Sequence, residues 1–375
     1  MSVFTVYFCG TGSHRFDDKN PNFWDGELIA TLASNHSGRE FVDWITVDGP
    51  GSGNLQDDAL FVDDGDHYKV TGTLFGKGWY ENVQHALQVI KGKSTWARTK
   101  LTEQQYQNLK SAGIPIPDAE AGGSWFWRTY DYGDRAVTPQ ALQEQLIKQL
   151  RKPLIPITVN LVGWSRGGIS CHMLANAMAQ DPELCDVKVN IFAIDPVPGV
   201  GNVQSERVQL GANVKEYVGF YARDERSKGF ACVVPVTAYG TRMSVLPMPG
   251  RHATLVGNAS IDGAGSGKAL PEPGMIVRHF AEVCLKRWGV TLDKCLDLSD
   301  AALMTYHKTI DANDELYRAM RKKSYTVLTE GTADERMVHR GSIATEFTQV
   351  RGEHMDPCDG LSIQRFDLNA YKALR

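Results

Sequence analysis

One serine near the middle of the chain lies between two glycines, in Gly163-Trp164-Ser165-Arg166-Gly167. The preceding residues, 154 to 162, are apolar and β-branched without helical spacing, which predicts a strand buried on both faces. After Gly168 apolar residues recur at helical steps as far as Asp181-Pro182, which predicts a helix. A turn between them would strain the serine backbone, bring strand and helix close and favour the flanking glycines, as a nucleophile elbow requires. A glycine-rich turn with an idle serine is the alternative.

Backbone amides near this serine are candidates for stabilising the oxyanion that forms when a serine attacks a carbonyl carbon. The Arg166 N–H falls at the N-terminus of the predicted helix, where the helix dipole favours negative charge. A second donor is expected from a loop after an early strand, where glycine lets the backbone approach a substrate closely. Thr11 and Gly12, in the segment after the predicted strand 3 to 9, fit this role. An ordinary turn at that point is the alternative.

A nucleophilic serine needs a histidine base, and the base needs a carboxylate to orient it. On sheets with such an elbow the acid and then the histidine follow along the chain, on loops at the carboxyl ends of later strands. His252 lies in a turn after the short apolar segment 243 to 248, whereas His279 and His307 fall inside amphipathic helices. Loop placement therefore favours His252 as the base. The other downstream histidines are His339 and His354.

Two aspartates are candidates for the acid. Asp195 ends the predicted strand 187 to 195 and is followed by Pro196-Val197-Pro198-Gly199, which stops the strand sharply. Asp224 follows the predicted strand 214 to 222, between arginines that could form salt bridges with it. Both positions are legitimate strand ends. We favour Asp195 and keep Asp224 as the alternative.

The composition is that of an ordinary soluble protein, with 375 residues, 42% of them hydrophobic and 22% charged, and a formal net charge of -4. Near-neutral charge without a long basic run argues against nucleic acid as the main partner. The seven cysteines lack C-x-x-C spacing, which favours reduced buried thiols and gives no zinc pattern. We therefore expect no metal and no other cofactor.

The N-terminal residues lack the charged region and long apolar core of a signal peptide, and they predict a first strand instead. No stretch is long enough to span a bilayer. We therefore expect synthesis in the cytoplasm, with any secretion by a signal-independent route.

Strand-like and helix-like segments alternate, which predicts an α/β fold with a mainly parallel sheet covered by helices on both faces. The predicted strands are 3 to 9, 41 to 47, 154 to 162, 187 to 195, 214 to 222 and 243 to 248. The predicted helices are 79 to 91, 138 to 151, 168 to 180, 275 to 288 and 299 to 321. Aromatic and polar residues at 92–137 predict a cap or lid insertion, or a packed excursion with a structural aromatic cluster. The predicted organisation is a core of 1–290 containing this insertion, then a C-terminal helical extension, 291–375, packed on the core.

Several blocks between residues 4 and 260 follow the order and spacing of a known family. They are Phe8-Cys9-Gly10-Thr11-Gly12, Gly49-Pro50-Gly51-Ser52-Gly53, Gly78-Trp79-Tyr80-Glu81-Asn82-Val83, Gly163-Trp164-Ser165-Arg166-Gly167-Gly168, Ala193-Ile194-Asp195-Pro196-Val197, Ala222-Arg223-Asp224-Glu225-Arg226 and Pro249-Gly250-Arg251-His252. In these blocks the chain resembles the α/β-hydrolase family, long described as a domain of unknown function, that includes type VI secretion lipase effectors of the first class. The corresponding family blocks include F-D-G-T, G-F-S-R-G-A, V-W-D-T-V, A-L-D-E-R and P-G-V-H.

The resemblance implies an α/β-hydrolase core with Ser165, Asp195 and His252 as a catalytic triad. Family members include phospholipases delivered into rival bacteria, so it also implies a lipase or phospholipase and a secreted antibacterial toxin. The implied partners are a lipid or other ester substrate, a membrane surface, and a secretion-apparatus or immunity protein. Cys9 and Pro196 replace a family aspartate and threonine, and 253 to 257 replaces S-D-V-G-G, which leaves the substrate open. A catalytically inactive binding module with the same fold is the alternative function.

Overall fold

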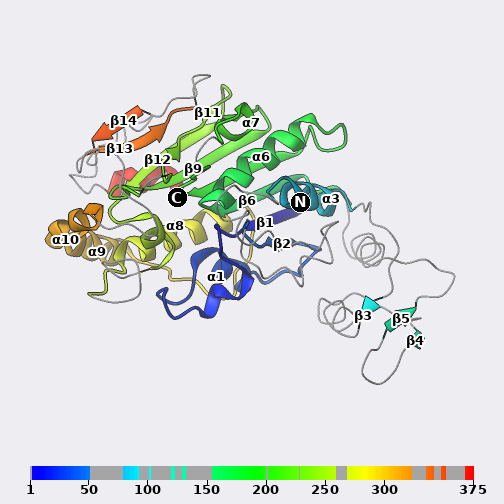
Figure 1. The fold of residues 1–375 in the computed structure, drawn as a ribbon, viewed down its shortest axis with the longest axis horizontal. Coiled ribbons are helices and arrows are strands. Elements are labelled where there is room, and N and C mark those ends of the chain that lie inside the picture. The colour runs from blue at the N-terminus through cyan, green and yellow to red at the C-terminus, as the bar shows by residue number, and fades with distance from the viewer. Residues whose placement is uncertain are drawn as a thin grey trace.

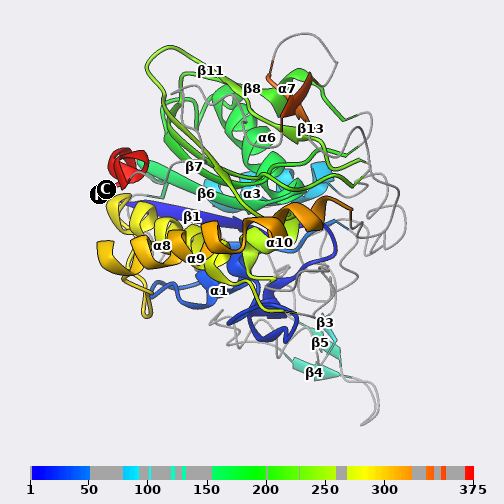
Figure 2. The same cartoon turned by 90° about the vertical axis from the view of Figure 1, so that its left-hand side faces the viewer.

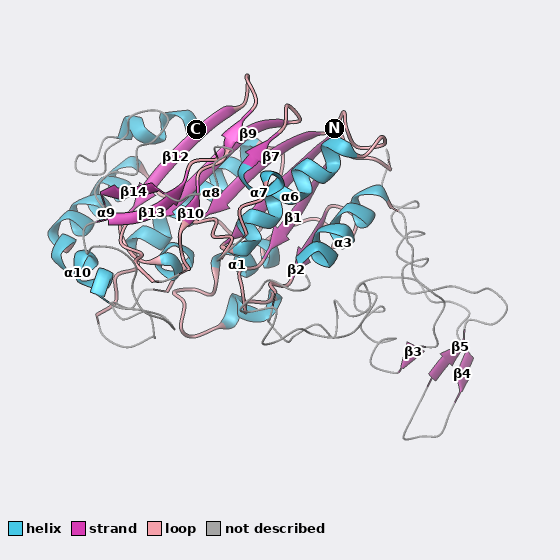
Figure 3. Ribbon diagram, turned by 45° about the horizontal axis from the view of Figure 1, so that its top comes forward, coloured by secondary structure: helices cyan, strands magenta, loops and turns pink. Residues whose placement is uncertain are grey.

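A six-stranded parallel sheet forms the centre of the protein in the computed structural model (Figure 1). The structure describes residues 2–50, 79–92, 101–102, 120–122, 129–131, 154–199, 202–227, 229–258, 268–322, 335–341, 348–351 and 368–375. In sheet order the strands are β12 (Arg242–Met248), β9 (Val214–Ala222), β7 (Lys188–Ile194), β6 (Thr158–Trp164), β1 (Val3–Phe8) and β2 (Trp44–Val47). Every neighbouring pair is parallel, so the carboxyl ends of the strands meet at one edge of the sheet (Figure 3). The predicted mainly parallel α/β sheet is confirmed.

Helices cover both faces of this sheet, which is why most residues of its central strands are apolar. Two buried asparagines are exceptions, and the Asn190 side-chain amide donates to Asn160 Oδ1 at 3.0 Å. In β1, Val6 packs in a cluster with α3 (Trp79–Lys91) and α6 (Arg166–Gln180). The next residue, Tyr7, packs in a second cluster with α1 (Leu28–Ser34) and α8 (Glu272–Arg287). Figure 2 shows α3 and α6 on one side of the strands, with α1, α8 and α9 (Asp300–Ala312) on the other. The alternation of strand side chains thus divides the core into two layers.

Most predicted elements agree with the structure, and β9 and α3 begin and end where they were predicted. The strand predicted at 154 to 162 begins later, at Thr158, and continues to Trp164. Pro156 has no N–H to donate to a neighbouring strand, which explains the later start. The elbow serine therefore follows the last strand residue directly.

The helix predicted at 299 to 321 is wrong as a single element. It consists of α9, α10 (Asp314–Ala319) and a final 3-10 turn, η4 (Met320–Lys322). Asn313 separates the two helices, and its side-chain amide donates to the Thr309 carbonyl oxygen at 2.7 Å. Such a local side-chain bond competes with the helical ladder. No prediction covered α1, whose seven residues give little periodicity, and the helix predicted at 138 to 151 lies outside the described residues.

Most of the predicted insertion at 92–137 also lies outside the described residues. Its described parts are β3 (Leu101–Thr102), β4 (Glu120–Gly122) and β5 (Thr129–Asp131), which form an antiparallel sheet in the order β3-β5-β4. The interpretation of this segment as a lid stays a prediction. Other short elements are η1 (Arg15–Lys19), α7 (Ser205–Val208), β8 (Gln209–Leu210), β11 (Val236–Thr237) and η3 (His252–Val256).

The segment 291–375 contains strands as well as helices, which the prediction of a helical extension did not include. β13 (Glu335–His339) pairs antiparallel with β14 (Thr348–Arg351) and parallel with β10 (Cys232–Val233). Leu303 of α9, Met320 of η4 and Leu374 of η5 (Leu368–Leu374) are buried in the same cluster as α8. This segment therefore contributes to the core and brings a strand to the side of β10.

Glu27, directly before α1, is a carboxylic acid with 0% of its surface exposed. Its oxygens accept hydrogen bonds from the backbone N–H groups of Ile29 at 3.1 Å and Ala30 at 3.0 Å. Burial raises the pKa of Glu27 to about 8, although these two bonds lower it. Folding therefore favours the protonated form of this acid.

We expect the free energy of unfolding to fall as pH rises from about 4.5 to about 8, because the folded pKa of Glu27 exceeds its unfolded value. The stabilisation is fully present below the unfolded pKa and is lost as the buried carboxyl ionises. Glu27→Gln keeps an acceptor oxygen but cannot ionise, so it should be more stable than wild type at the upper end of this range only. Urea denaturation at both ends measures this, with the exposed Glu315→Gln as control. Equal pH dependence in wild type and Glu27→Gln would contradict it.

Candidate active site

Ser165 lies in the turn between β6 and α6 at the carboxyl edge of the sheet. Its φ of 60° and ψ of −126° are a strained backbone conformation, and its side chain makes no capping hydrogen bond to α6. A Cβ on Gly163 would lie 2.3 Å from the Gly167 carbonyl oxygen, and a Cβ on Gly167 would lie 2.2 Å from that of Phe8. Only glycine fits at these two positions. The turn has the geometry of a nucleophile elbow.

Gly167→Ala is expected to destabilise the protein by about 3 kcal/mol or more, because the added methyl group meets the backbone oxygens of Phe8 and Cys9, which cannot move aside easily. Gly240→Ala is the matched control. A Cβ at Gly240 meets nothing within 4 Å, and only its φ of 92° is unfavourable to alanine. That cost is about 1–2 kcal/mol. Urea denaturation of both variants measures the difference, and equal losses would show that the close approach at Gly167 is not rigid.

Asp195 follows the last residue of β7, beside the elbow. The Ser165 N–H donates to the Ile194 carbonyl oxygen at 3.0 Å, and the Val197 N–H donates back to that of Ser165 at 3.2 Å. The Asp195 carboxylate is 0% exposed, and its Oδ1 accepts from the Ala222 N–H at 3.0 Å. These bonds to two neighbouring strands fix both the backbone and the carboxylate of Asp195 next to the serine turn.

His252 begins η3, in the loop after β12, and it contacts Asp195. Its Nδ1 lies 2.6 Å from Asp195 Oδ2. A carboxylate acceptor favours the tautomer with the proton on Nδ1, which leaves Nε2 as the basic nitrogen. The imidazole lies between two rings, tilted against Trp164 at 5.0 Å between centroids and edge-to-face with Phe230 at 5.1 Å. The backbone N–H of His252 donates to Glu225 Oε2 at 3.2 Å. The ring is thus oriented on several sides.

Asp224, the alternative acid, is buried but has other partners. Its carboxylate accepts from Arg223 Nε at 3.0 Å, from Arg321 Nε at 2.8 Å and from the Gly250 N–H at 3.0 Å. These contacts tie the end of β9 to the start of the histidine loop and to η4. Between the two acid candidates, the structure places Asp195 in hydrogen-bond contact with the ring of His252 and Asp224 in an arginine cluster.

The remaining downstream histidines lie elsewhere. His279 and His307 are in α8 and α9, as predicted, where His279 Nδ1 accepts from the Leu298 N–H at 3.1 Å and His307 Nε2 lies 3.0 Å from the Tyr371 hydroxyl. His339 is buried in β13 and accepts from the Gly341 N–H at 3.0 Å. His354 lies outside the described residues.

Arg336 of β13 is a site residue that sequence reasoning missed. Its Nη1 lies 2.8 Å from Asp195 Oδ1, and its Nη2 donates to Asp195 Oδ2 at 2.8 Å. Burial alone would raise the pKa of Asp195, but the charge of Arg336 and the bonds from His252 lower it to about 2. Asp195 is therefore ionised across the physiological pH range. No motif in the sequence marks Arg336, which is 141 residues away from its partner.

The three residues predicted to supply oxyanion donors differ in the contacts that the structure gives them. The Arg166 N–H belongs to the first turn of α6, whose amides point out of the helix end toward the serine turn. The Gly12 N–H donates to the Pro50 carbonyl oxygen at 3.1 Å, so in this conformation it is engaged with the chain itself. The Thr11 hydroxyl accepts from the Arg166 guanidinium at 3.3 Å, which places the loop after β1 beside the elbow. Burial and then the charge of Arg207 lower the pKa of Arg166 to about 10, which leaves it cationic at neutral pH.

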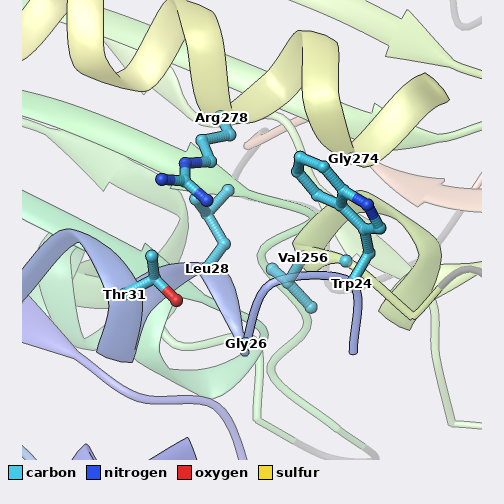
Figure 4. A pocket seen from close by; sticks show the side chains of 8 residues that line it. Trp24, Gly26, Leu28, Thr31, Val256, Gly274 and Arg278 are labelled. Atoms are coloured by element: carbon cyan, nitrogen blue, oxygen red, sulfur yellow. The ribbon is translucent and has the colours of Figure 1, made fainter. Parts of the chain in front are cut away.

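Two small cavities adjoin the histidine loop. One, of about 10 Å³, has Phe230, Glu225 and Arg336 in its lining and lies beside the Asp195–His252 pair. The other, also about 10 Å³, lies between η3, α8 and the N-terminal loop, with Trp24, Val256 and Arg278 around it (Figure 4). Each has room for about one water molecule. The Trp24 N–H donates to the Gly257 carbonyl oxygen at 2.6 Å, so the N-terminal loop is fastened to the end of the histidine loop.

Among the residues that the structure describes, no group of three or more histidine, cysteine, aspartate or glutamate side chains is arranged to hold a metal ion. Within the same residues, no helix has the length and apolar character needed to cross a bilayer.

The fold is α/β, with a parallel six-stranded sheet between two helical layers and a strained serine turn at its carboxyl edge. No protein-family model matches the chain, and no curated protein matches it either. Among solved structures it is similar to an uncharacterized protein from Pseudomonas aeruginosa, at 12% identity and a TM-score of 0.42 over 84% of this chain and 52% of that chain. It is also similar to the Tle1 effector in its structure bound to the VgrG spike from the Type 6 secretion system, at 14% identity and a TM-score of 0.32 over 68% of this chain and 50% of that chain. The chain spans about half the length of each of these two solved chains.

Proposed function

We propose that the protein is a serine hydrolase that cleaves carboxylic esters, with Ser165 as nucleophile, His252 as general base and Asp195 as the acid that orients it. The observation that carries the proposal is the 2.6 Å contact between His252 Nδ1 and Asp195 Oδ2 at the sheet edge where Ser165 occupies its strained turn. A buried carboxylate, an imidazole and a serine at a strand-to-helix turn are the three groups that this chemistry needs.

In the proposed reaction, Ser165 Oγ attacks the ester carbonyl carbon while His252 Nε2 accepts the hydroxyl proton. The carbonyl oxygen becomes an oxyanion facing the Arg166 N–H. As the tetrahedral intermediate collapses, the alcohol oxygen leaves with the proton from His252, and an acyl-serine remains. Water then attacks the acyl carbon as His252 takes its proton, and the carboxylic acid leaves while Ser165 regains its hydrogen. Asp195 stays ionised throughout because it accepts the Nδ1 proton of His252.

The contribution of the loop after β1 to oxyanion binding is part of the proposal. The Gly12 N–H would contribute after exchanging its bond to the Pro50 carbonyl oxygen for one to the substrate. Thr11 lies in the same loop and is held against Arg166 through its hydroxyl. Apo sites often have catalytic bonds that form only with substrate bound.

We further propose a lipid ester as the substrate, with phospholipid as the favoured class. The support is the resemblance of the glycine, serine, aspartate and histidine blocks to the family of secreted lipase effectors. The same resemblance supports an antibacterial role, export by a signal-independent route, peripheral contact with a membrane, and a secretion-apparatus or immunity protein as partner.

A fluorophosphonate probe tests the core of this proposal, because it reacts with activated serines: the serine oxygen bonds to phosphorus and fluoride leaves. We expect labelling of the purified protein, with the modification mapped by mass spectrometry to the peptide containing Ser165. Hydrolysis of a soluble short-chain p-nitrophenyl ester and of phosphatidylcholine or phosphatidylethanolamine vesicles then defines the substrate. Labelling of Ser165 without hydrolysis of the vesicles would support the proposed esterase activity and contradict the proposed lipid substrate. A protein that is neither labelled nor active on any ester would reject the enzyme and favour a hydrolase-fold binding module.

A further inference from the structure

The carboxylate of Asp195 is shared between two partners, the guanidinium of Arg336 and the imidazole of His252. Arg336 approaches both of its oxygens at 2.8 Å, and His252 approaches Oδ2 at 2.6 Å. Arg336 is 2% exposed and also donates to the carbonyl oxygens of Ala222 and, at 3.2 Å, Phe230. Both terminal nitrogens of the guanidinium are thus bound to backbone oxygens, and this fixes the plane of the carboxylate that they also contact.

The charge of Arg336 also changes what Asp195 does for the base. An isolated aspartate stabilises the imidazolium that forms when the histidine accepts a proton. Arginine stays protonated in proteins, so Asp195 and Arg336 form a pair with no net charge before His252 takes up any proton. The neutral pair attracts the imidazolium less than a lone carboxylate would. Loss of Arg336 would therefore leave a lone carboxylate beside the base, and that carboxylate would attract the imidazolium more strongly.

On the basis of the proposed triad, we infer that Arg336 is a positioning residue that fixes the Asp195 carboxylate against His252 and extends the activity of Ser165 toward acidic pH. It acts through Asp195 and does not touch the reacting atoms. Arg336 belongs to β13. The pairing of Val338 and His339 with Cys232 and Val233 of β10 holds this strand beside the site.

Other ionisable groups around the pair already have partners or are neutral. Glu225 accepts from three backbone N–H groups, those of Arg226, Ser227 and His252. It also lies 3.7 Å from the Nε of Arg251. Burial raises the pKa of Cys232 to about 12, and it raises the pKa of Tyr217 and Tyr221 further, so these three groups stay neutral.

Two further charged groups belong to the arginine cluster around β9. Asp224 is paired with Arg223 and Arg321. Arg226 donates to the backbone carbonyl oxygens of Arg223 and Glu225, and burial lowers its pKa to about 10, which still leaves it cationic. Of these charged side chains, Arg336 is the one that forms the ion pair with both oxygens of Asp195.

The test measures the rate constant of fluorophosphonate labelling as a function of pH, with the probe in large excess. A fraction of protein that is permanently misfolded lowers the amplitude of labelling and leaves this rate constant unchanged. Arg336→Met removes both contacts to the carboxylate and the positive charge. We therefore expect the fall in the labelling rate constant on the acidic side of the pH profile to occur about one pH unit higher than in wild type. We also expect its plateau to fall about tenfold, because the acid is no longer oriented. Arg336→Lys keeps a cation but cannot contact both carboxylate oxygens in the same way. Its maximal labelling rate constant should therefore fall, while the acidic side of its pH profile stays near that of wild type.

Arg321→Met is the matched control, since it removes a buried arginine that pairs with Asp224, the aspartate that does not contact His252. It should lower stability without moving the acid limb. An unmoved limb in Arg336→Met, an equal shift in Arg321→Met, or a wild-type plateau in Arg336→Lys would each overturn the inference. If Arg336→Met does not fold, the maximal labelling rate constant of Arg336→Lys still tests the positioning role. Failure of the wild-type protein to label would instead reject the proposed function, so the two failures are distinguishable.

Discussion

Replacing Ser165 by alanine is expected to abolish fluorophosphonate labelling and to lower the turnover of any ester substrate by about 10⁶-fold. The alanine has no oxygen to form the acyl intermediate, and nothing else in the turn between β6 and α6 supplies one. The fold should be retained, because the side chain of Ser165 makes no capping bond to α6. Single-turnover hydrolysis and intact-protein mass spectrometry measure the two effects.

Ser227→Ala is the matched control for this variant. Ser227 is also buried, at 2% exposure, and lies in the lining of the small cavity beside Arg336, but it is not at the elbow. It should label and turn over at rates close to those of wild type. If Ser165→Ala keeps the labelling and Ser227→Ala loses it, the nucleophile has been assigned to the wrong serine.

Asp195→Asn is expected to lower turnover by about 10⁴-fold, because an amide in place of the carboxylate favours the wrong histidine tautomer and cannot stabilise the imidazolium. Asp224→Asn should keep most of the activity and lose stability, since Asp224 is the common partner of Arg223 and Arg321. The comparison discriminates between the two acids that the sequence leaves open. Labelling rate constants and thermal unfolding are measured on both variants.

A contrary result would be equally clear. If Asp224→Asn loses activity as severely as Asp195→Asn while remaining folded, the contact between His252 and Asp195 is not the functional one. The acid would then have to reach the histidine through a rearranged loop after β12. Loss of activity in neither variant would remove the acid from the proposed mechanism altogether.

The parts of this site that could be predicted from sequence are those specified by neighbouring residues. The turn at Ser165 is set by an apolar strand, two glycines and a helix within a short stretch of chain. Asp195 and His252 are recognisable because each follows a strand, and parallel strands place their carboxyl ends together. Local patterns and the rules of sheet topology therefore predict Ser165 and His252, and they leave Asp195 and Asp224 as the two candidates for the acid.

The rest depends on contacts between distant segments, which leave no periodic signal. Arg336 is indistinguishable in the sequence from other arginines, and its role follows only from the pairing of β13 with β10. The engagement of the Gly12 N–H by Pro50 depends on the path of a later loop. Likewise, the break at Asn313 results from one side-chain bond to Thr309, which helical periodicity does not reveal.

The position of Arg336 late in the chain has a consequence for biosynthesis. A nascent polypeptide that has not reached β13 already contains Ser165, Asp195 and His252, and every strand of the central sheet. Its buried aspartate would still lack the guanidinium that neutralises it, and an unpaired buried charge is costly. Completion of this ion pair therefore waits for the synthesis of β13. If Arg336 acts as we infer, the full activity of the serine arises only after β13 has been made and has paired with β10.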